Sequence, residues 1–170
     1  MPNSVKFTKV TATIPERLSK SYHLNADGSL RKEGGGQLIK GAIEVLEVSS
    51  LAHFGSVLQS LTPQHALIYG LPKKDVGLLH SKSYHNKLAS PTNATTRTKD
   101  EFTWPSEGGV MMLDYDPRSD EVPMSRTALV EALRGAVSGL QNASMLWWPS
   151  ASSCIWAEGS ELKGTDGQRL

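Results

Sequence analysis

The sequence predicts a mixed α+β or α/β fold in which a β-sheet is covered by at least two helices. Three observations support this fold class. Apolar residues recur along the chain in alternation, first at the spacing of a strand and then at that of a helix. The 170 residues, 38% of them hydrophobic and 21% charged, are enough to bury a core without disulfide bonds or a structural metal. No apolar run reaches the length of about 18 to 20 residues that crosses a bilayer.

Charge and cysteine content limit the binding partners and the cellular compartment that we expect for this protein. The chain carries 18 lysines and arginines against 17 acidic residues, a net charge of +1, so contact with nucleic acid requires a local basic patch. Its single cysteine, Cys154, forms no intrachain disulfide, which fits a reducing compartment. The first ten residues lack the apolar centre of a signal peptide. We therefore expect a soluble, cytoplasmic protein with no membrane partner.

The N-terminal sequence predicts a strand followed by a polar segment. Residues 6–14 alternate apolar and polar side chains and are rich in β-branched residues, which predicts a strand that ends at Pro15. Residues 16–37 are polar, with a turn sequence at 25–28 and three consecutive glycines at 34–36. This segment predicts a loop or a mobile arm.

A strand, a helix and a short strand are predicted next. Residues 38–48 predict a strand with one buried face. Ser49 or Ser50 can cap the following helix, which ends before Pro63. The helix carries an apolar stripe expected in the core: Leu51, Phe54, Val57, Leu58 and Leu61. Residues 66–69 predict a short buried strand.

The centre of the chain combines a long polar connection with the clearest apolar strand. Residues 73–107 are rich in Ser, Thr, Asn, Lys and His, and a connection of this length is usually functional or mobile. Residues 109–113 (GVMML) are apolar without interruption and predict a buried strand.

The C-terminal part predicts one helix and further short strands. A helix begins at Ser125, and its apolar stripe is expected to pack on a sheet: Leu129, Val130, Leu133, Val137 and Leu140. Residues 145–148 and 154–157 predict two short strands. Residues 162–170 resemble a turn that leads into another strand, so we expect the domain to be incomplete at its C-terminus.

Asp114 and Asp116 directly follow the apolar run 109–113. Residues two apart on a strand share a face, so the two carboxylates are expected to converge at the carboxyl edge of the sheet. Mg²⁺ and Mn²⁺ use one or two protein carboxylates and take other ligands from water and phosphates. Two such ions about 3.5 to 4 Å apart stabilise the attacking 3′ oxygen and the departing pyrophosphate of a nucleotidyl transfer. The alternative is that both acids only end a strand before Pro117.

Several segments together resemble a known family. They are GQLIKGAIEVLEVSS at 36–50, VMMLDYDP at 110–117, WWPSASSCIW at 147–156 and ELKGTDGQRL at 161–170. This order resembles the N-terminal primase-polymerase module of plasmid, phage and integrative-element replication proteins, in the archaeo-eukaryotic primase superfamily, and MLDYDP is its sharpest point. The resemblance implies a primase-polymerase-like catalytic domain at 36–170, preceded at 1–35 by a strand and a flexible polar segment.

The resemblance also implies roles for particular residues. Asp114 and Asp116 are expected to be catalytic and to bind Mg²⁺ or Mn²⁺, with a DNA template and nucleoside triphosphates as partners and a replicative helicase domain or protein as a further one. The second motif of the family is a Gly-rich turn that leads to a histidine, and the matching residues 164–169 end in Arg169 instead. An arginine can still neutralise a triphosphate. The third motif, a further carboxylate, is expected beyond Leu170.

Other polar residues are weaker candidates. Lys163, Ser152 and Ser153 are candidates for nucleotide or phosphate binding, and Arg97 and Lys99 for binding nucleic acid. For each, a solvated polar loop is the plainer interpretation. His80 and His85 lack a third ligand at the spacing of a zinc site.

Three functional hypotheses follow. The first is metal-dependent nucleotidyl transfer in DNA replication. The second is a phosphatase of the haloacid-dehalogenase type, with Asp114 as nucleophile and Asp116 as acid and base; Pro117 and Arg118 oppose it, because such enzymes prefer a small flexible pair there. The third is a truncated, non-catalytic module that binds DNA or a replication partner.

Overall fold

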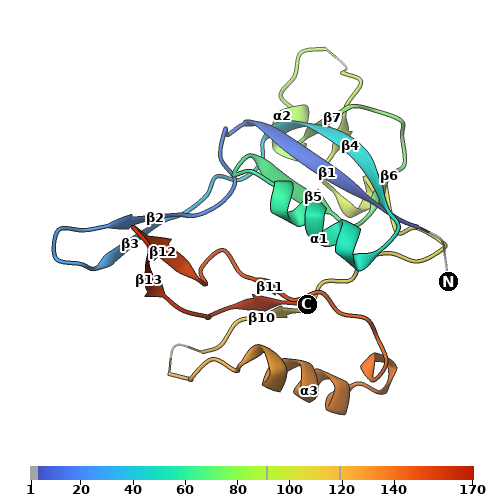
Figure 1. Ribbon diagram of the computed structural model, residues 1–170. Helices are drawn as coiled ribbons and strands as arrows, with labels where there is room; N and C mark the ends of the chain where they lie inside the picture. The colour runs from blue at the N-terminus through green and yellow to red at the C-terminus, as the bar shows by residue number, and fades with distance from the viewer. Residues whose placement is uncertain (1–3, 91, 119) are drawn as a thin grey trace. The chain divides into compact units, whose positions relative to one another are not determined.

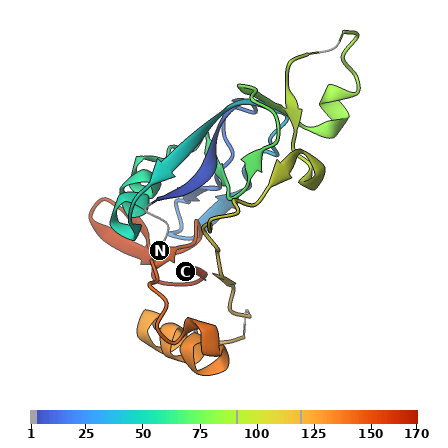
Figure 2. The ribbon, with the colours of Figure 1, turned by 90° about the vertical axis from the view of Figure 1, so that its right-hand side faces the viewer.

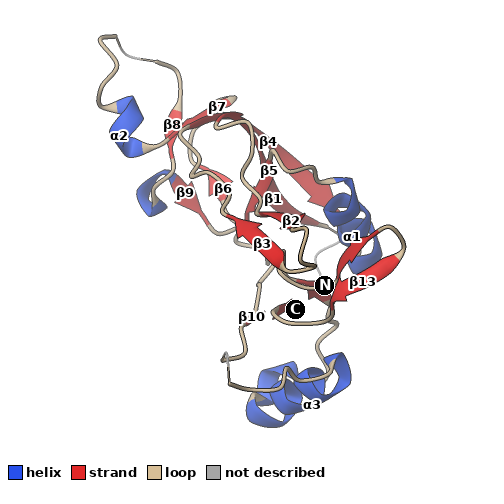
Figure 3. Ribbon diagram, turned by 90° about the vertical axis from the view of Figure 1, so that its left-hand side faces the viewer, coloured by secondary structure: helices blue, strands red, loops and turns tan. Residues whose placement is uncertain are grey.

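The computed structural model describes residues 4–90, 92–118 and 120–170 and divides into two compact units (Figure 1). Unit 1 comprises the residues up to 21 together with 34–111, and unit 2 comprises 22–33 together with 112–170. The boundary expected after residue 35 does not coincide with this division. Helices and strands occur in both units, which confirms a mixed α+β protein (Figure 3).

Unit 1 is built on a five-stranded sheet with the order β5-β1-β4-β7-β8. Its strands are β1 (Val5–Ile14), β4 (Lys40–Val48), β5 (His65–Ile68), β7 (Leu78–His80) and β8 (Thr95–Thr96). The pairs are antiparallel except for β7 and β8, which run parallel. The predicted strands at 6–14, 38–48 and 66–69 are confirmed to within two residues at their starts.

The two faces of this sheet bury different residues. One face carries the main apolar core, which consists of Val10, Ala12, Leu38, Ile43 and Leu79. The opposite face of β1 carries Phe7, which is fully buried. Alternate residues of a strand point to opposite faces, so the pattern of β1 divides its side chains between these two apolar layers.

Helix α1 (Leu51–Ser60) covers the face that carries Phe7. Ser50 begins the helix as its N-cap, and its Oγ accepts a hydrogen bond of 3.0 Å from the backbone N–H of His53. Phe54 is buried and meets the Phe7 ring edge to face, with 5.2 Å between ring centroids. Figures 1 and 2 both show α1 beside the strands of this sheet. The predicted helix is confirmed, although Leu51 of its stripe is 37% exposed.

The prediction that residues 16–37 form only a loop or mobile arm is wrong. Strands β2 (Ser21–Leu24) and β3 (Leu30–Glu33) form a two-stranded sheet. The expected turn joins them: Gly28 has a φ of 80°, and Asp27 Oδ1 accepts a hydrogen bond of 2.9 Å from the backbone N–H of Ser29. This turn allows two polar segments to pair as strands, although neither segment has an apolar pattern.

The connection at 73–107 is more ordered than its composition predicts. Besides β7 and β8 it contains α2 (Lys82–His85), the 3-10 helix η1 (Lys99–Glu101) and β9 (Phe102–Thr103), which pairs with β6 (Leu71–Pro72). Strand β7 obtains its hydrogen bonds from β4, and β8 obtains its own from β7. Pairing with distant residues therefore creates these strands.

Unit 2 contains a three-stranded sheet, a hairpin and one longer helix. The sheet has the order β10-β14-β11, and its strands are β10 (Asp114–Tyr115), β14 (Gln168–Arg169) and β11 (Trp148–Pro149). The hairpin consists of β12 (Ile155–Ala157) and β13 (Ser160–Lys163). Helix α3 (Arg126–Ala136) is followed by the 3-10 helix η2 (Ser138–Leu140).

The prediction of a buried strand at 109–113 is wrong. These residues do not form a strand, and Met111 is 61% exposed. Pairing begins at Leu113, which exchanges two backbone hydrogen bonds with Leu170, and continues into β10. An apolar run forms part of a sheet only where another segment pairs with its backbone. The strand predicted at 145–148 is likewise confined to Trp148 and Pro149, where an edge position tolerates proline.

The core of unit 2 combines α3 with a polar centre. The helix begins after Ser125, whose Oγ accepts a hydrogen bond of 3.2 Å from the backbone N–H of Ala128, and it buries Leu129. Its predicted stripe is only partly buried, since Val137 is 47% exposed. Gln168 is fully buried: its Oε1 accepts from Trp147 Nε1 at 2.7 Å, and its Nε2 donates to the Met124 carbonyl at 2.6 Å.

Within the described part of the chain, no helix combines the length and the apolar character needed to span a membrane.

Replacing Phe54 by alanine is expected to destabilise unit 1 by about 3 kcal/mol, because a buried ring is lost and a cavity forms beside Phe7. The matched control is Leu51→Ala in the same helix, which is expected to cost less than about 1 kcal/mol because Leu51 is partly exposed. Hydrogen exchange of the β1 and β4 amides measures both effects. An equal loss of protection in the two variants would contradict the packing of α1 on β1.

Acidification is expected to destabilise unit 1 through His80. This residue is 2% exposed, and its burial, followed by the charges of His85 and Lys40, lowers its pKa below the ordinary value of 6.5. Below pH 6.5 the unfolded chain binds more protons than the folded chain, so the free energy of unfolding falls as the pH drops through that range. Exchange of the β1 amides between about pH 7.5 and about pH 5.5 measures this dependence. His80→Gln is expected to reduce it and exposed His53→Gln to leave it unchanged; the same slope in His80→Gln as in the native chain would exclude His80 as its source.

Candidate functional site

The candidate site lies on one face of the three-stranded sheet of unit 2. In the register of this sheet, Asp114 lies opposite Arg169, and Arg169 lies opposite Trp148 on its other side. Residues directly opposite each other in antiparallel strands share a face. Asp116 comes directly after β10 and Gly167 directly before β14, and Asp116 Oδ1 lies close to Gly167.

Asp114 and Arg169 form an ion pair across the β10–β14 ladder. The Arg169 Nε donates a hydrogen bond of 3.2 Å to Asp114 Oδ1, and each side chain is 41% exposed. Among the described residues, this guanidinium has no other hydrogen bond or ion pair. Its terminal nitrogens are therefore available to a ligand.

Asp116 and Ser150 converge over Gly167. A β-carbon built on Gly167 would lie 2.7 Å from Asp116 Oδ1 and 2.8 Å from Ser150 Oγ. A methyl group at this position would therefore displace both side chains. The absence of a side chain at Gly167 is what allows the carboxylate and the hydroxyl to approach each other above the strand.

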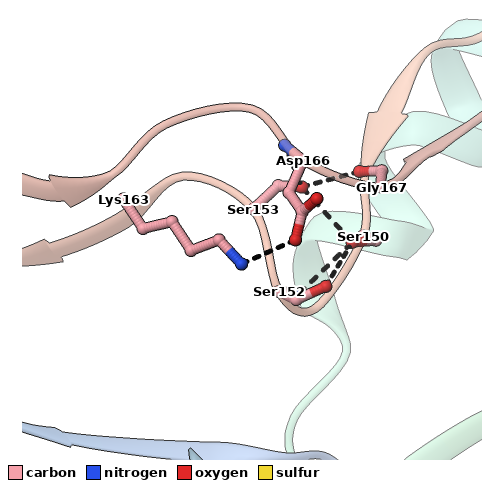
Figure 4. Close-up of polar contacts among 6 residues, drawn as sticks. All are labelled: Ser150, Ser152, Ser153, Lys163, Asp166 and Gly167. Carbon is pink, nitrogen blue, oxygen red and sulfur yellow. Dashed lines mark hydrogen bonds and ion pairs between the residues drawn. The ribbon is translucent and has the colours of Figure 1, made fainter. Parts of the chain in front are cut away.

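A serine turn supports the end of this face (Figure 4). The buried Ser153 Oγ donates to the Gly167 carbonyl at 2.6 Å and accepts from the Asp166 backbone N–H at 2.9 Å. Ser150 Oγ lies 3.0 Å from Ser152 Oγ and 3.3 Å from Ser153 Oγ. Ser153 therefore stabilises the turn before β14. Ser150 and Ser152 share hydrogen bonds that can rearrange around a ligand.

Lys163 is held by an acidic neighbour. Its Nζ donates a hydrogen bond of 2.6 Å to Asp166 Oδ2, and the side chain of Lys163 is 40% exposed (Figure 4). The pair closes the turn between β13 and β14. A phosphate would therefore compete with Asp166 for this ammonium group.

The structure brings most of the predicted site residues into one unit. Six predicted residues lie in unit 2: Asp114, Asp116, Ser152, Ser153, Lys163 and Arg169. Arg97 and Lys99 lie in unit 1 as exposed residues after β8. Sequence reasoning did not assign a site role to Gly167 or Asp166; the Gly-rich turn at 164–167 was the signal available for both.

The expected position of the two aspartates is corrected in one respect. They were expected at the carboxyl edge of a buried sheet, whereas Asp114 lies within β10, whose pairing with β14 is antiparallel. The carboxylates still share a face, because Asp116 lies over Gly167 two positions from the Asp114–Arg169 pair.

The donor set fits a metal that takes few protein ligands. Among the described residues, no group of three or more His, Cys, Asp or Glu side chains is placed to hold a metal ion. Two carboxylates on one face suit Mg²⁺ or Mn²⁺, which complete their coordination with water and phosphate oxygens. The Arg169 guanidinium lies beside Asp114 and competes with a cation for that carboxylate.

Fold and site together define a mixed α+β protein that exposes two carboxylates and a guanidinium beside a turn of buried and half-buried serines. No protein-family model, no curated protein and no solved structure matches the chain. Any assignment to a particular family therefore depends on the residues themselves.

Replacing Arg169 by glutamine is expected to change the free energy of unfolding of unit 2 by less than about 1 kcal/mol, because an exposed ion pair contributes little. The same change is expected to raise the affinity of the nucleotide-free protein for Mn²⁺ by roughly three- to tenfold, since Asp114 loses a cationic neighbour. Titration followed by electron paramagnetic resonance measures the affinity, and exposed Arg134→Gln in α3 is the matched control. An unchanged or reduced affinity for Mn²⁺ in Arg169→Gln would show that the guanidinium does not compete for Asp114.

Proposed function

We propose that unit 2 binds a nucleoside triphosphate together with Mg²⁺ or Mn²⁺, and that this site serves metal-dependent nucleotidyl transfer on a DNA template, as in a primase-polymerase-like domain. The observation that carries the proposal is the ion pair of Asp114 with Arg169, together with the approach of Asp116 to Gly167, two residues before Arg169. Two hard oxygen ligands next to a guanidinium are complementary to a triphosphate with its divalent cation.

In this proposal some residues of the site bind the cation and others bind the phosphates. Asp114 and Asp116 would hold the metal, and a bound metal would stabilise negative charge on the triphosphate and on the attacking 3′ oxygen. Arg169 would turn from Asp114 to a phosphate oxygen, because its planar guanidinium binds phosphate through two parallel hydrogen bonds. Ser152 can donate a further hydrogen bond from the turn beside Ser150.

The Asp114–Arg169 pair would couple the binding of metal to the binding of nucleotide. In the ligand-free chain the guanidinium neutralises one of the two carboxylates, so a cation alone meets a partly occupied site. A nucleotide that arrives with its metal offers the guanidinium a phosphate and the carboxylate a cation at the same time. Metal and nucleotide are therefore expected to bind cooperatively.

A non-catalytic module that binds DNA or a replication partner is the alternative. Unit 2 exposes several large apolar side chains, a feature of surfaces that bind other molecules: Met112, Val122, Met124, Val137 and Trp156. Val122 is 90% exposed. This alternative needs neither a metal nor turnover.

The proposal is tested by Mn²⁺ binding to the native chain and to the double variant Asp114→Asn with Asp116→Asn, each with and without a deoxynucleoside triphosphate. We expect micromolar binding that tightens at least about tenfold with nucleotide and is lost in the double variant, because one neutralised phosphate contact contributes about 1.4 kcal/mol or more. The matched control is Asp75→Asn with Asp100→Asn, two exposed carboxylates of unit 1. Equal binding by the double variant and the control, with both folded, would exclude the site.

Two further measurements sharpen this test. Gly167→Ala is expected to weaken binding of Mn²⁺ with nucleotide, because its methyl group displaces Asp116 and Ser150, whereas a β-carbon at Gly164 would meet only Glu161 Oε1 at 3.5 Å. Gly164→Ala is therefore its control. Incorporation of a labelled nucleotide on single-stranded DNA tests transfer directly. Cooperative binding without incorporation would favour the non-catalytic alternative.

A further inference from the structure

Unit 1 contains a pocket at one edge of its five-stranded sheet, with a volume of about 660 Å³. Four strands contribute residues at their ends: Pro15 follows β1, Ile39 precedes β4, Ser81 follows β7, and Arg97 follows β8. The pocket is therefore formed by the main sheet itself. Volumes of roughly 300 to 1,000 Å³ are typical of sites for small molecules.

Backbone hydrogen bonds fix these segments against one another. The Ser81 N–H donates to the Ile39 carbonyl at 2.7 Å, and the Arg97 N–H donates to the His80 carbonyl at 2.8 Å. Strands β7 and β8 run parallel, so the residues after both strands emerge at the same edge. Ligands of open sheets commonly bind outside the carboxyl ends of parallel strands.

The pocket carries uncompensated positive charge. Lys82 and Arg97 line it, no acidic residue does, and within the described residues neither cation has an ion-pair partner. The polar residues Gln37, Ser81 and Ser83 line the same space. Two free cations beside neutral hydrogen-bonding groups are complementary to an oxyanion.

An apolar side of the pocket adds a second element of recognition. Pro15 and Ile39 line it, and Ile39 is 38% exposed although it lies next to the core residue Leu38. A ligand that fits both sides carries an anionic group and a flat apolar ring. Inorganic phosphate alone would leave this apolar side uncovered.

We propose that this pocket is a second ligand site, which binds the phosphate of a nucleotide at Lys82 and Arg97 and its ring against Pro15 and Ile39. The nucleotide is either free or one unit of a single strand of nucleic acid. This proposal does not rest on the function proposed for unit 2, because the pocket contains no carboxylate and needs no metal.

The test is calorimetric titration of the full chain in the presence of a chelator, which leaves the carboxylate site of unit 2 without divalent ions. The probes are inorganic phosphate, thymidine monophosphate and a short oligothymidine strand. The variant Lys82→Gln with Arg97→Gln is expected to bind thymidine monophosphate at least about tenfold more weakly than the native chain, since two charge-assisted contacts are lost. The control is Lys20→Gln with Lys73→Gln, which removes the same charge from exposed positions outside the pocket.

The variant Ile39→Ser tests binding of the ring separately from binding of the phosphate. It is expected to weaken binding of thymidine monophosphate while leaving the weaker binding of inorganic phosphate unchanged. Tighter binding of oligothymidine than of the mononucleotide would identify a nucleic-acid strand as the source of the phosphate, and the reverse order would identify free nucleotide.

Amide chemical shifts locate the binding. Shifts confined to residues around Gln37, Ser81 and Arg97 would support the pocket. The proposal is overturned if none of the probes binds, if the control loses affinity as much as the double variant, or if the shifts lie elsewhere. All the substituted lysines and Arg97 are exposed, so the variants are expected to remain folded.

Discussion

Strand β14 holds β10 on one side and β11 on the other, and its two residues organise unit 2. Gln168 points into the core, where its amide binds the indole N–H of Trp147 and the carbonyl of Met124. A buried amide with both ends satisfied is costly to displace, because either partner left alone would be an unpaired polar group. The side chain therefore fixes which residue of β14 faces inward.

That constraint determines what lies on the outer face. Because side chains alternate along a strand, an inward Gln168 sets Gly167 and Arg169 on the opposite side. The antiparallel register then aligns Arg169 with Asp114 and brings Asp116 over Gly167. A slip of one residue would turn the guanidinium into the core and break the candidate site.

Sequence patterns predicted the elements that depend on local chemistry. β1 follows from its own alternation, and α1 and α3 follow from apolar spacing and from the serine caps at Ser50 and Ser125. The short strands β7 and β8 did not follow, because they depend on hydrogen bonds to residues far along the chain. The short strands β5 and β12 were predicted from their apolar residues. The apolar run 109–113 has the composition of a strand, but its backbone pairing with Leu170 begins only at its last residue, Leu113. Of the candidate site, the shared face of Asp114 and Asp116 was predictable from their spacing, whereas the neighbouring Arg169 required the register.

The two sites differ in charge and therefore in what each needs to hold a phosphate. The face of unit 2 carries two carboxylates and one guanidinium. A phosphate is therefore repelled there until a divalent cation neutralises the acids. The pocket of unit 1 offers two cations and no acid, so it attracts an anion directly but loses that attraction as salt rises. Divalent metal would thus be required for a phosphate to bind at the proposed site of unit 2 and would not be required at the proposed pocket of unit 1, so a chelator distinguishes the two proposals.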